Sequence, residues 1–281
     1  MAVLVFGASS QIGHFLLPRL RACGESIVAL SRKPRPEQAG VQWLQGDLPD
    51  RVPAVAQPSA VINFGPLASF AAWLASADLP STTRIIATSS MSAESKQASD
   101  VPAERVLSQT LRDGEAAVAA VCDSKGMAWT IFRPTLIYGA GIDKSLSPIA
   151  RRARRLHVFP LPAGRGLRQP VHADDIAAAV VAALDHPQAA GRILPLGGGE
   201  RLTAAEMFAR VRRSLATPTI PLPIPAVLLR AGRHAVPRLR GPLTRLEADL
   251  IADNGELQRL LGISPRPFRP DASCWEPQRP L

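Results

Sequence analysis

A chain of 281 residues is long enough for one large α/β domain, or for such a domain with a smaller appendage. It contains no run of about twenty uncharged apolar residues, which excludes a membrane-spanning helix, and we expect no signal peptide because no basic region precedes the first apolar run. Three widely spaced cysteines match no zinc spacing and suit a reducing compartment, so we expect a cytoplasmic protein without a metal site.

The net charge of +10 raises the question of an anionic partner such as nucleic acid or lipid. The cations are mostly arginines scattered along the chain, and aromatic residues make up only 5% of it. The sequence contains no recognisable nucleic-acid-binding motif. We therefore expect no nucleic-acid partner and no membrane partner.

The first eighteen residues predict a strand, a turn of small residues and a helix. Residues 2–6 are a nearly continuous apolar run, as in a strand that is buried on both faces of a parallel sheet. Gly7 follows at once, and Gly13 opens a helical apolar pattern that continues past Pro18, where we expect a kink. Such a turn lets the backbone and the free N–H groups of the helix approach a pyrophosphate.

This turn resembles the Gly-x-x-Gly-x-x-Gly turn of the short-chain dehydrogenase/reductase superfamily, in particular its extended, epimerase/dehydratase-like branch. The chain departs from that pattern at Ser10, which replaces the middle glycine and can cap the helix with its side-chain oxygen. The resemblance implies a Rossmann-type doubly wound parallel sheet and a nicotinamide dinucleotide held by the turn. The contacts that it implies are Gly7, Ser9, Ser10, Gln11, Ile12 and Gly13.

A second strand is predicted over residues 26–30, and it ends in Ser31, Arg32 and Lys33. At this strand end an acidic residue binds the ribose 2′-hydroxyl of NAD, whereas basic residues accommodate the 2′-phosphate of NADP. No carboxylate is present here, so we expect NADP(H) to be preferred over NAD(H). The alternative is a solvated basic loop before Pro34.

Residues 41–45 and 60–64 predict the third and fourth strands, and a helix is expected over 67–77. Asp47 and Leu48 follow the third strand, where the family makes an adenine contact, although Asp47 is also a common turn residue. By the same resemblance, Phe64 and Gly65 pass beside the phosphates and ribose of the cofactor.

The fifth strand, over 84–88, leads into a serine cluster, of which Ser90 is a candidate to polarise a substrate oxygen. Alternatively, the cluster only ends the strand. A long helix is predicted over 102–125, where the superfamily carries its Tyr-x-x-x-Lys pair. When Glu115 is matched to the family's glutamate, the pair falls on Leu107 and Leu111, neither of which can carry a proton.

The sixth strand, over 128–133, runs into a segment that resembles the family's Arg-Pro-x-x-x-Tyr-Gly, in which Arg133 and Pro134 would lie near the nicotinamide. Tyr138 is the only tyrosine of the chain, so it is a candidate proton donor. The alternative, which we favour, is that it only packs beneath the substrate loop. Residues 148–156 predict a helix with four arginines on one face, which either bind an anion or are simply solvated.

Residues 167–177 resemble the family's Pro-Val-His-Val-x-Asp-Val-Ala element, in which His172 has a structural or substrate-loop role and two aspartates begin a helix. A last strand is expected over 192–196, followed by a capping box at residues 203–206. The stretch 218–242 is punctuated by proline and arginine, and 242–261 is expected to be helical.

Together these patterns predict a Rossmann-type domain over residues 1–217, with substrate-loop contributions from about 139–170, and a small, largely helical C-terminal lobe over 218–281. Two functions remain open. One is an oxidoreductase or epimerase, acting as a monomer or homodimer on a small carbonyl, hydroxyl or nucleotide-sugar-like substrate without the usual Tyr-Lys pair. The other is a non-catalytic dinucleotide-binding sensor or regulatory subunit.

Overall fold

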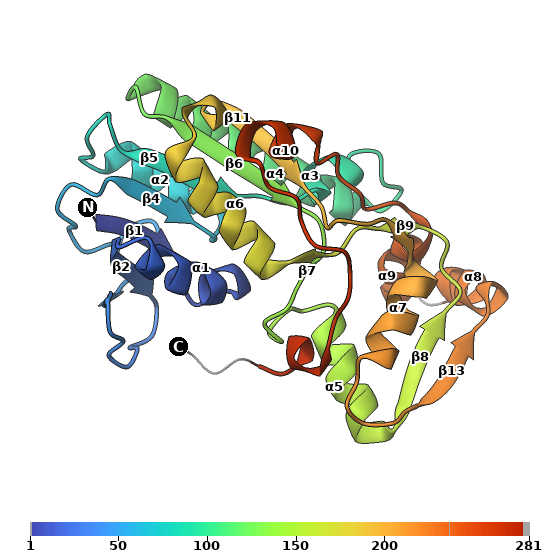
Figure 1. Ribbon diagram of the computed structural model, residues 1–281. Coiled ribbons are helices and arrows are strands. Elements are labelled where there is room, and N and C mark those ends of the chain that lie inside the picture. Colours follow the sequence, from blue (N-terminus) through green and yellow to red (C-terminus); the bar gives the residue numbers. More distant parts are fainter. Residues whose placement is uncertain (1, 236, 278–281) are drawn as a thin grey trace.

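A seven-stranded parallel sheet forms the centre of the computed structural model, which describes residues 2–235 and 237–277 (Figure 1). Its strand order is β11-β6-β5-β4-β1-β2-β3, so β1 lies in the interior between β4 and β2, as predicted. The strands are β1 (Ala2–Phe6), β2 (Ser26–Ser31), β3 (Val41–Gln45), β4 (Ala60–Asn63), β5 (Arg84–Thr88), β6 (Trp129–Pro134) and β11 (Arg192–Leu196).

Helices cover both faces of this sheet, which explains why its strands read as continuous apolar runs. Val3 and Val5 join one buried cluster with α1 (Gln11–Ala22), α6 (Ala173–Asp185) and α10 (Gly255–Leu261). Leu4 and Phe6 point the other way, into a cluster with α2 (Leu67–Ser76) and α4 (Pro102–Ser124). The doubly wound fold predicted from the sequence is therefore confirmed.

A third buried cluster lies beyond the carboxyl end of the sheet and forms the core of a smaller lobe (Figure 1). It contains Tyr138, Phe159, Phe208 and Trp275, which come from stretches far apart in the sequence. The boundary after residue 217 stays a prediction, and residues 278–281 lie outside the described part of the chain. The main elements here are α5 (Leu146–Leu156), β8 (Val158–Pro162), α7 (Ala204–Arg213), β13 (Ile220–Ile224), α8 (Ala226–Ala235), α9 (Pro237–Glu247) and the 3₁₀ turn Ala272–Trp275.

Short elements connect the two parts. The two-residue strands β7 (Ile137–Tyr138) and β10 (Val171–His172) pair in parallel, and β9 (Leu167–Arg168) pairs with β12 (Leu202–Thr203). The remaining helical turns are α3 (Ser92–Ser95) and Pro187–Ala189. Among residues 2–235 and 237–277, no helix is both long and apolar enough to cross a bilayer.

The expectation of one helix over residues 242–261 is wrong. Helix α9 ends at Glu247 and α10 begins only at Gly255. The segment between them docks against the body of the protein: the Leu250 amide donates to the Leu167 carbonyl, and the Ala252 amide donates to the Gln169 side chain. Because these tertiary partners take the backbone donors, the helix is interrupted despite its sequence pattern.

Candidate dinucleotide site

The turn between β1 and α1 requires glycine at its first and last positions. Gly7 has a φ of +70°, and a Cβ there would lie 3.1 Å from the Cβ of Phe64. A Cβ on Gly13 would lie 2.1 Å from the carbonyl oxygen of Ala8. Ser10 has an extended backbone and caps α1 as predicted, its Oγ accepting the Gly13 amide at 3.2 Å. Serine in place of the middle glycine therefore does not disturb the turn.

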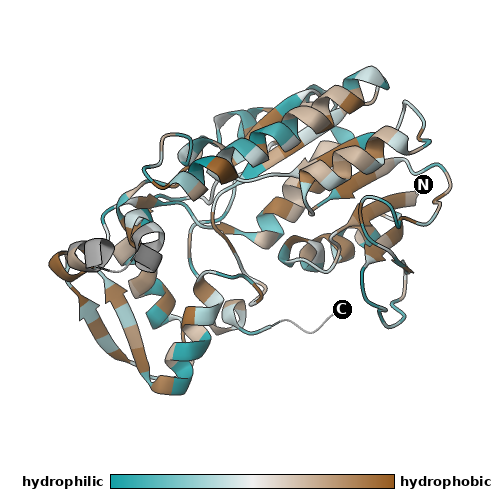
Figure 2. Cartoon of the chain, turned by 180° about the vertical axis from the view of Figure 1, so that it is seen from behind, coloured by the Kyte–Doolittle hydropathy of each residue, from teal (hydrophilic) through white to brown (hydrophobic). Residues whose placement is uncertain are grey.

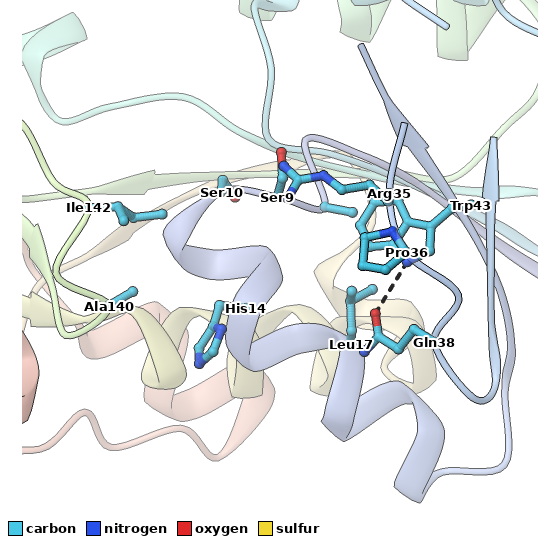
Figure 3. Close-up of a pocket in the computed structure, with 11 residues that line it drawn as sticks. Ser9, Ser10, His14, Leu17, Arg35, Pro36, Gln38, Trp43, Ala140 and Ile142 are labelled. Carbon is cyan, nitrogen blue, oxygen red and sulfur yellow. Dashed lines mark hydrogen bonds between the residues drawn. The ribbon is translucent and has the colours of Figure 1, made fainter. Parts of the chain in front are cut away.

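A cavity of about 240 Å³ opens over this turn and the first turns of α1 (Figure 3). One wall is the loop after β2 together with Trp43 of β3, and another is the segment after β7. An anion placed here would face the N-terminal end of α1, where first-turn N–H groups have no helical partner. The lining residues are Ala8, Ser9, Ser10, His14, Leu17, Arg35, Pro36, Gln38, Trp43, Ala140 and Ile142.

Arg35 is the cation that lines this cavity, whereas Arg32 does not line it. The Arg35 Nε donates to the Ser31 Oγ at 3.3 Å, and its guanidinium carbon lies 5.7 Å from the centre of the Trp43 ring. Arg32 is exposed and borders a separate hollow of about 200 Å³ with Gln45, Gly46 and Arg51. Sequence reasoning missed Arg35 because it lies four residues beyond the strand end, between two prolines.

Ser31 organises this loop rather than lining the cavity. Its buried side chain accepts hydrogen bonds from both the Arg35 Nε and the Lys33 amide, at 3.3 Å each. Trp43 is held in turn by its indole N–H, which donates to Gln38 at 3.2 Å (Figure 3). The rim of the cavity is therefore preorganised by contacts between the loop after β2 and the strand β3.

Asp47 and Leu48 follow β3 outside the residues that line the cavity. The Asp47 backbone exchanges hydrogen bonds with Arg51 at 2.9 and 3.0 Å, which closes a turn, and Leu48 packs on the α2 side of the sheet. The adenine contact that the resemblance implies for Asp47 stays a prediction.

The carboxyl ends of β4 and β5 lie beside the glycine turn. Phe64 contacts Gly7, and the Gly65 amide donates to the Asn63 side chain at 3.0 Å. The Ser90 Oγ accepts the Ser92 amide at 3.1 Å and so stabilises the start of α3. Within the described part of the chain, the neighbouring Ser89 Oγ is buried without a hydrogen-bond partner. Ser89 is therefore a candidate to hydrogen-bond a ligand at this end of the sheet.

Glu115 of α4 and Arg133 of β6 form an ion pair that the sequence did not predict, with the Arg133 Nε donating to Oε1 at 2.8 Å. Arg133 also donates to Glu94, and the hydrogen bonds that it donates to Glu115 raise the pKa of its guanidinium. Leu107 and Leu111 lie on α4 without being part of its buried face. Because Arg133 is engaged by two carboxylates, its predicted contact with a cofactor, like that of the buried Pro134, stays a prediction.

Tyr138 packs in the core of the smaller lobe and does not line the cavity. Only 1% of the residue is exposed, and its ring lies 4.9 Å from Phe268 and 5.0 Å from His172, measured between ring centres. Burial raises the pKa of its phenol, so the hydroxyl stays protonated. His172 has the structural role expected of it, because its Nδ1 accepts the Asp174 amide at 3.1 Å and caps α6.

These features fit a dinucleotide. The glycine cradle leaves room that a side chain would fill, a helix N-terminus faces the cavity, and Arg35 adds a cation at its rim. In the described residues, Gln11 at the start of α1 also has a buried side-chain oxygen without a partner, as Ser89 does. Both orphaned atoms lie on segments that meet at the carboxyl end of the sheet, where such ligands bind.

Comparisons with known proteins agree with this geometry. The model of the NAD dependent epimerase/dehydratase family matches residues 3–108 and 94–197. UDP-glucose 4-epimerase of Vibrio cholerae is 28% identical over 116 residues, which are 40% of this chain and 35% of that protein. The chain thus matches about a third of the length of this curated relative.

Solved structures show the same fold over nearly the whole chain. MoeE5 in complex with UDP-glucuronic acid and NAD superimposes with a TM-score of 0.72 at 18% identity, covering 98% of this chain and 97% of the other. UDP-glucuronic acid 4-epimerase from Bacillus cereus, with UDP-glucuronic acid and NAD, gives 0.69 at 16% identity and covers 94% of both chains. At these identities the likeness establishes the fold alone.

Proposed function

The chain belongs to the NAD-dependent epimerase/dehydratase family, and from that premise we propose that it binds a nicotinamide dinucleotide, NADP(H) in preference to NAD(H), in the cavity above α1. We further propose that it acts on a small carbonyl, hydroxyl or nucleotide-sugar-like substrate, in the cytoplasm and as a monomer or homodimer. The observation that carries the cofactor proposal is the joint position of the glycine turn, the α1 N-terminus and Arg35 around one cavity.

In this proposal each wall of the cavity binds a different group of the cofactor. The backbone of Ser9 to Gly13 and the first turn of α1 hold the pyrophosphate, because N–H groups at a helix N-terminus favour negative charge. Arg35 binds the 2′-phosphate, since its link to Ser31 uses only one of the five N–H groups of a guanidinium. When bound, the nicotinamide supplies hydride transfer; the protein has to place it at the ends of β4, β5 and β6.

Proton transfer in this site cannot follow the superfamily's usual route. The helix α4 contains neither tyrosine nor lysine, and the matching positions are Leu107 and Leu111. We propose that the Ser89 hydroxyl binds and polarises a substrate oxygen, with water completing the proton transfer. Ser90 is bonded to the backbone and Tyr138 is packed among aromatic rings, so both are weaker candidates.

The absence of the tyrosine and lysine from α4 also favours a second function, a sensor or regulatory subunit that binds the dinucleotide without turnover. A cofactor-oxidation assay with a panel of aldehydes, ketones and nucleotide sugars separates the two functions. NADPH oxidation, or interconversion of two sugar nucleotides, supports the enzyme. Tight NADPH binding with no product from any substrate class supports the sensor.

Cofactor binding itself is tested at Ser10 with two substitutions of similar size. Ser10→Asn and Ser10→Asp both keep a side-chain oxygen that caps α1, so both variants should fold as the parent does. Only Ser10→Asp places a negative charge where the pyrophosphate is proposed to lie. In titration calorimetry we expect NADPH affinity to fall about tenfold or more for Ser10→Asp and to change little for Ser10→Asn. Equal affinities for the two variants would contradict the proposed site.

A further inference from the structure

The positive charge of this protein is concentrated in two stretches of the chain that contain no carboxylate. Residues 144–173 hold seven cations and residues 207–246 hold eight, without a single Asp or Glu in either stretch. The remainder of the chain carries 18 cations against 23 carboxylates, so it is net acidic. The basic character of the whole protein therefore originates in these two stretches.

The fold brings the two stretches together in the smaller lobe (Figure 1). The first contains α5 and β8, and the second contains most of α7 together with β13, α8 and most of α9. Strand β8 pairs with β13, and the Phe159 ring of β8 contacts Phe208 of α7. Arg154, Arg210 and Arg245 pair with carboxylates from outside the stretches, whereas Arg152, Arg155, Arg165 and Arg213 are exposed.

The same lobe exposes apolar side chains on one face of its two-stranded sheet. Ile220 and Leu222 pair with Val158 and Pro160 on the face opposite to Phe159, and they are 68% and 52% exposed. The chain continues from β13 into α8, where Val227 and Leu228 are 66% and 61% exposed. Figure 2 shows this apolar β13 at the edge of the lobe.

The free edge of β13 is unsuited to pairing with another strand. Ile220 donates its amide to His157 and Ile224 accepts from Ala163, so these residues direct their backbone groups toward β8. The alternate residues Pro221 and Pro223 face the outer edge and have no N–H to donate. A second copy or a peptide could not add a regular strand here, which leaves the apolar face itself as the contact surface.

We propose that this lobe docks on the surface of an anionic phospholipid bilayer, and this revises the expectation of no membrane partner. Exposed Ile, Leu and Val enter the boundary between headgroups and acyl chains, while exposed arginines of the same lobe bind lipid phosphates. Nucleic acid is the other polyanion, but the only aromatic residues of the two stretches are Phe159 and Phe208, both buried. No Phe, Tyr or Trp ring of these stretches is thus available for stacking on bases.

Vesicle co-sedimentation of the full chain tests this docking. We expect binding to vesicles of phosphatidylcholine containing one third phosphatidylglycerol, little binding to phosphatidylcholine alone, and release at about 1 M salt, where charges are screened within ~3 Å. Absence of binding to the anionic vesicles at low salt would overturn the proposal. So would a single-stranded uridine oligonucleotide that binds the chain more tightly than these vesicles do.

Matched substitutions locate the surface. Val227→Ser with Leu228→Ser should weaken vesicle binding about tenfold. The control is Val106→Ser with Leu107→Ser, an exposed Val-Leu pair on α4 that is 66% and 42% exposed. It should leave vesicle binding unchanged. Equal losses from the two pairs would refute the assignment to this lobe.

A second pair of variants separates local from overall charge. Arg152→Glu with Arg155→Glu should reduce vesicle binding about tenfold or more. Arg21→Glu with Arg105→Glu changes the net charge of the protein by the same amount, at exposed arginines outside the lobe. If both double variants lose vesicle binding equally, the attraction depends on the net charge of the protein alone and the proposed surface is wrong. Circular dichroism of each variant confirms that it is folded.

Discussion

Glu115 and Arg133 form a two-point ion pair between α4 and the end of β6, with Nε donating to Oε1 at 2.8 Å and a second bond from Nη2 to Oε2. Only 2% of the Glu115 side chain is exposed. Each residue belongs to a segment that carried the family resemblance, and their pairing ties α4 to the carboxyl end of the sheet. The helix that bears the superfamily's proton-transfer pair is thus anchored here, although the pair itself is replaced by leucines.

Replacement of Glu115 should be costly to stability. Glu115→Gln leaves the largely buried Arg133 guanidinium with only the half-exposed Glu94 as a charged partner. We expect the free energy of unfolding in urea to fall by about 3 kcal/mol. The control Glu94→Gln removes the more exposed partner and should cost less than about 1 kcal/mol. A smaller loss from Glu115→Gln than from Glu94→Gln would show that the buried pair is not the anchor.

The cofactor's 2′-phosphate should be recognised by Arg35. Arg35→Ala should weaken NADPH binding about tenfold or more and NADH binding much less, because a charge-assisted contact to phosphate is worth roughly 1.5–3 kcal/mol. Arg32→Ala, which removes a neighbouring exposed cation that does not line the cavity, is the control and should change both affinities little. Titration calorimetry with both nucleotides measures this. A loss of NADPH affinity only in Arg32→Ala would assign the phosphate to the residue expected from the sequence.

Tyr138 should be dispensable for turnover. Its ring is enclosed by Phe268, His172 and Trp275, and its phenol stays protonated because burial raises its pKa. With a substrate identified, we expect Tyr138→Phe to retain kcat within about twofold. Ser89→Ala should lower kcat about 10²-fold, as removal of a group that assists proton transfer does. The opposite pattern would make Tyr138 the proton donor.

Acid should weaken the junction where Asp174 of α6 meets α1 and the C-terminal segment. The Asp174 carboxylate accepts from the Arg19 Nε and from Arg266, at 2.7 Å each. Burial raises the pKa of Asp174, but the hydrogen bonds from these two arginines outweigh it and hold the pKa below its ordinary value of 3.8. Because the folded pKa is depressed, this stabilisation is present above pH ~4 and is lost as pH falls through the folded pKa.

The corresponding measurement is urea unfolding from pH 6 down to pH ~2.5. Asp174→Asn should lower the free energy of unfolding by about 1–2 kcal/mol at pH 6. The difference from the parent should shrink toward the acid end of the range, because protonation of the parent's carboxyl removes the contribution of its charge. A stability difference that stays constant over the whole range would mean that the charge of Asp174 does not contribute.

The sequence by itself determined the central sheet and the glycine turn. Continuous apolar runs such as residues 2–6 predict strands covered on both faces, and Gly7 and Gly13 stand where a Cβ would collide with Phe64 and Ala8. The Ser10 cap was also predictable, since a cap depends on the residues next to it in the chain. These features rest on local chemistry and short-range spacing.

Only the tertiary structure decided which side chains meet. It placed Arg35 instead of Arg32 at the cavity, left the Ser89 hydroxyl without a partner, and broke the helix expected over 242–261. It also brought the two carboxylate-free stretches 144–173 and 207–246 together through the pairing of β8 with β13. Each of these outcomes depends on contacts between residues far apart in the chain. The hydrophobic periodicity of a single segment predicts its secondary structure but not such contacts.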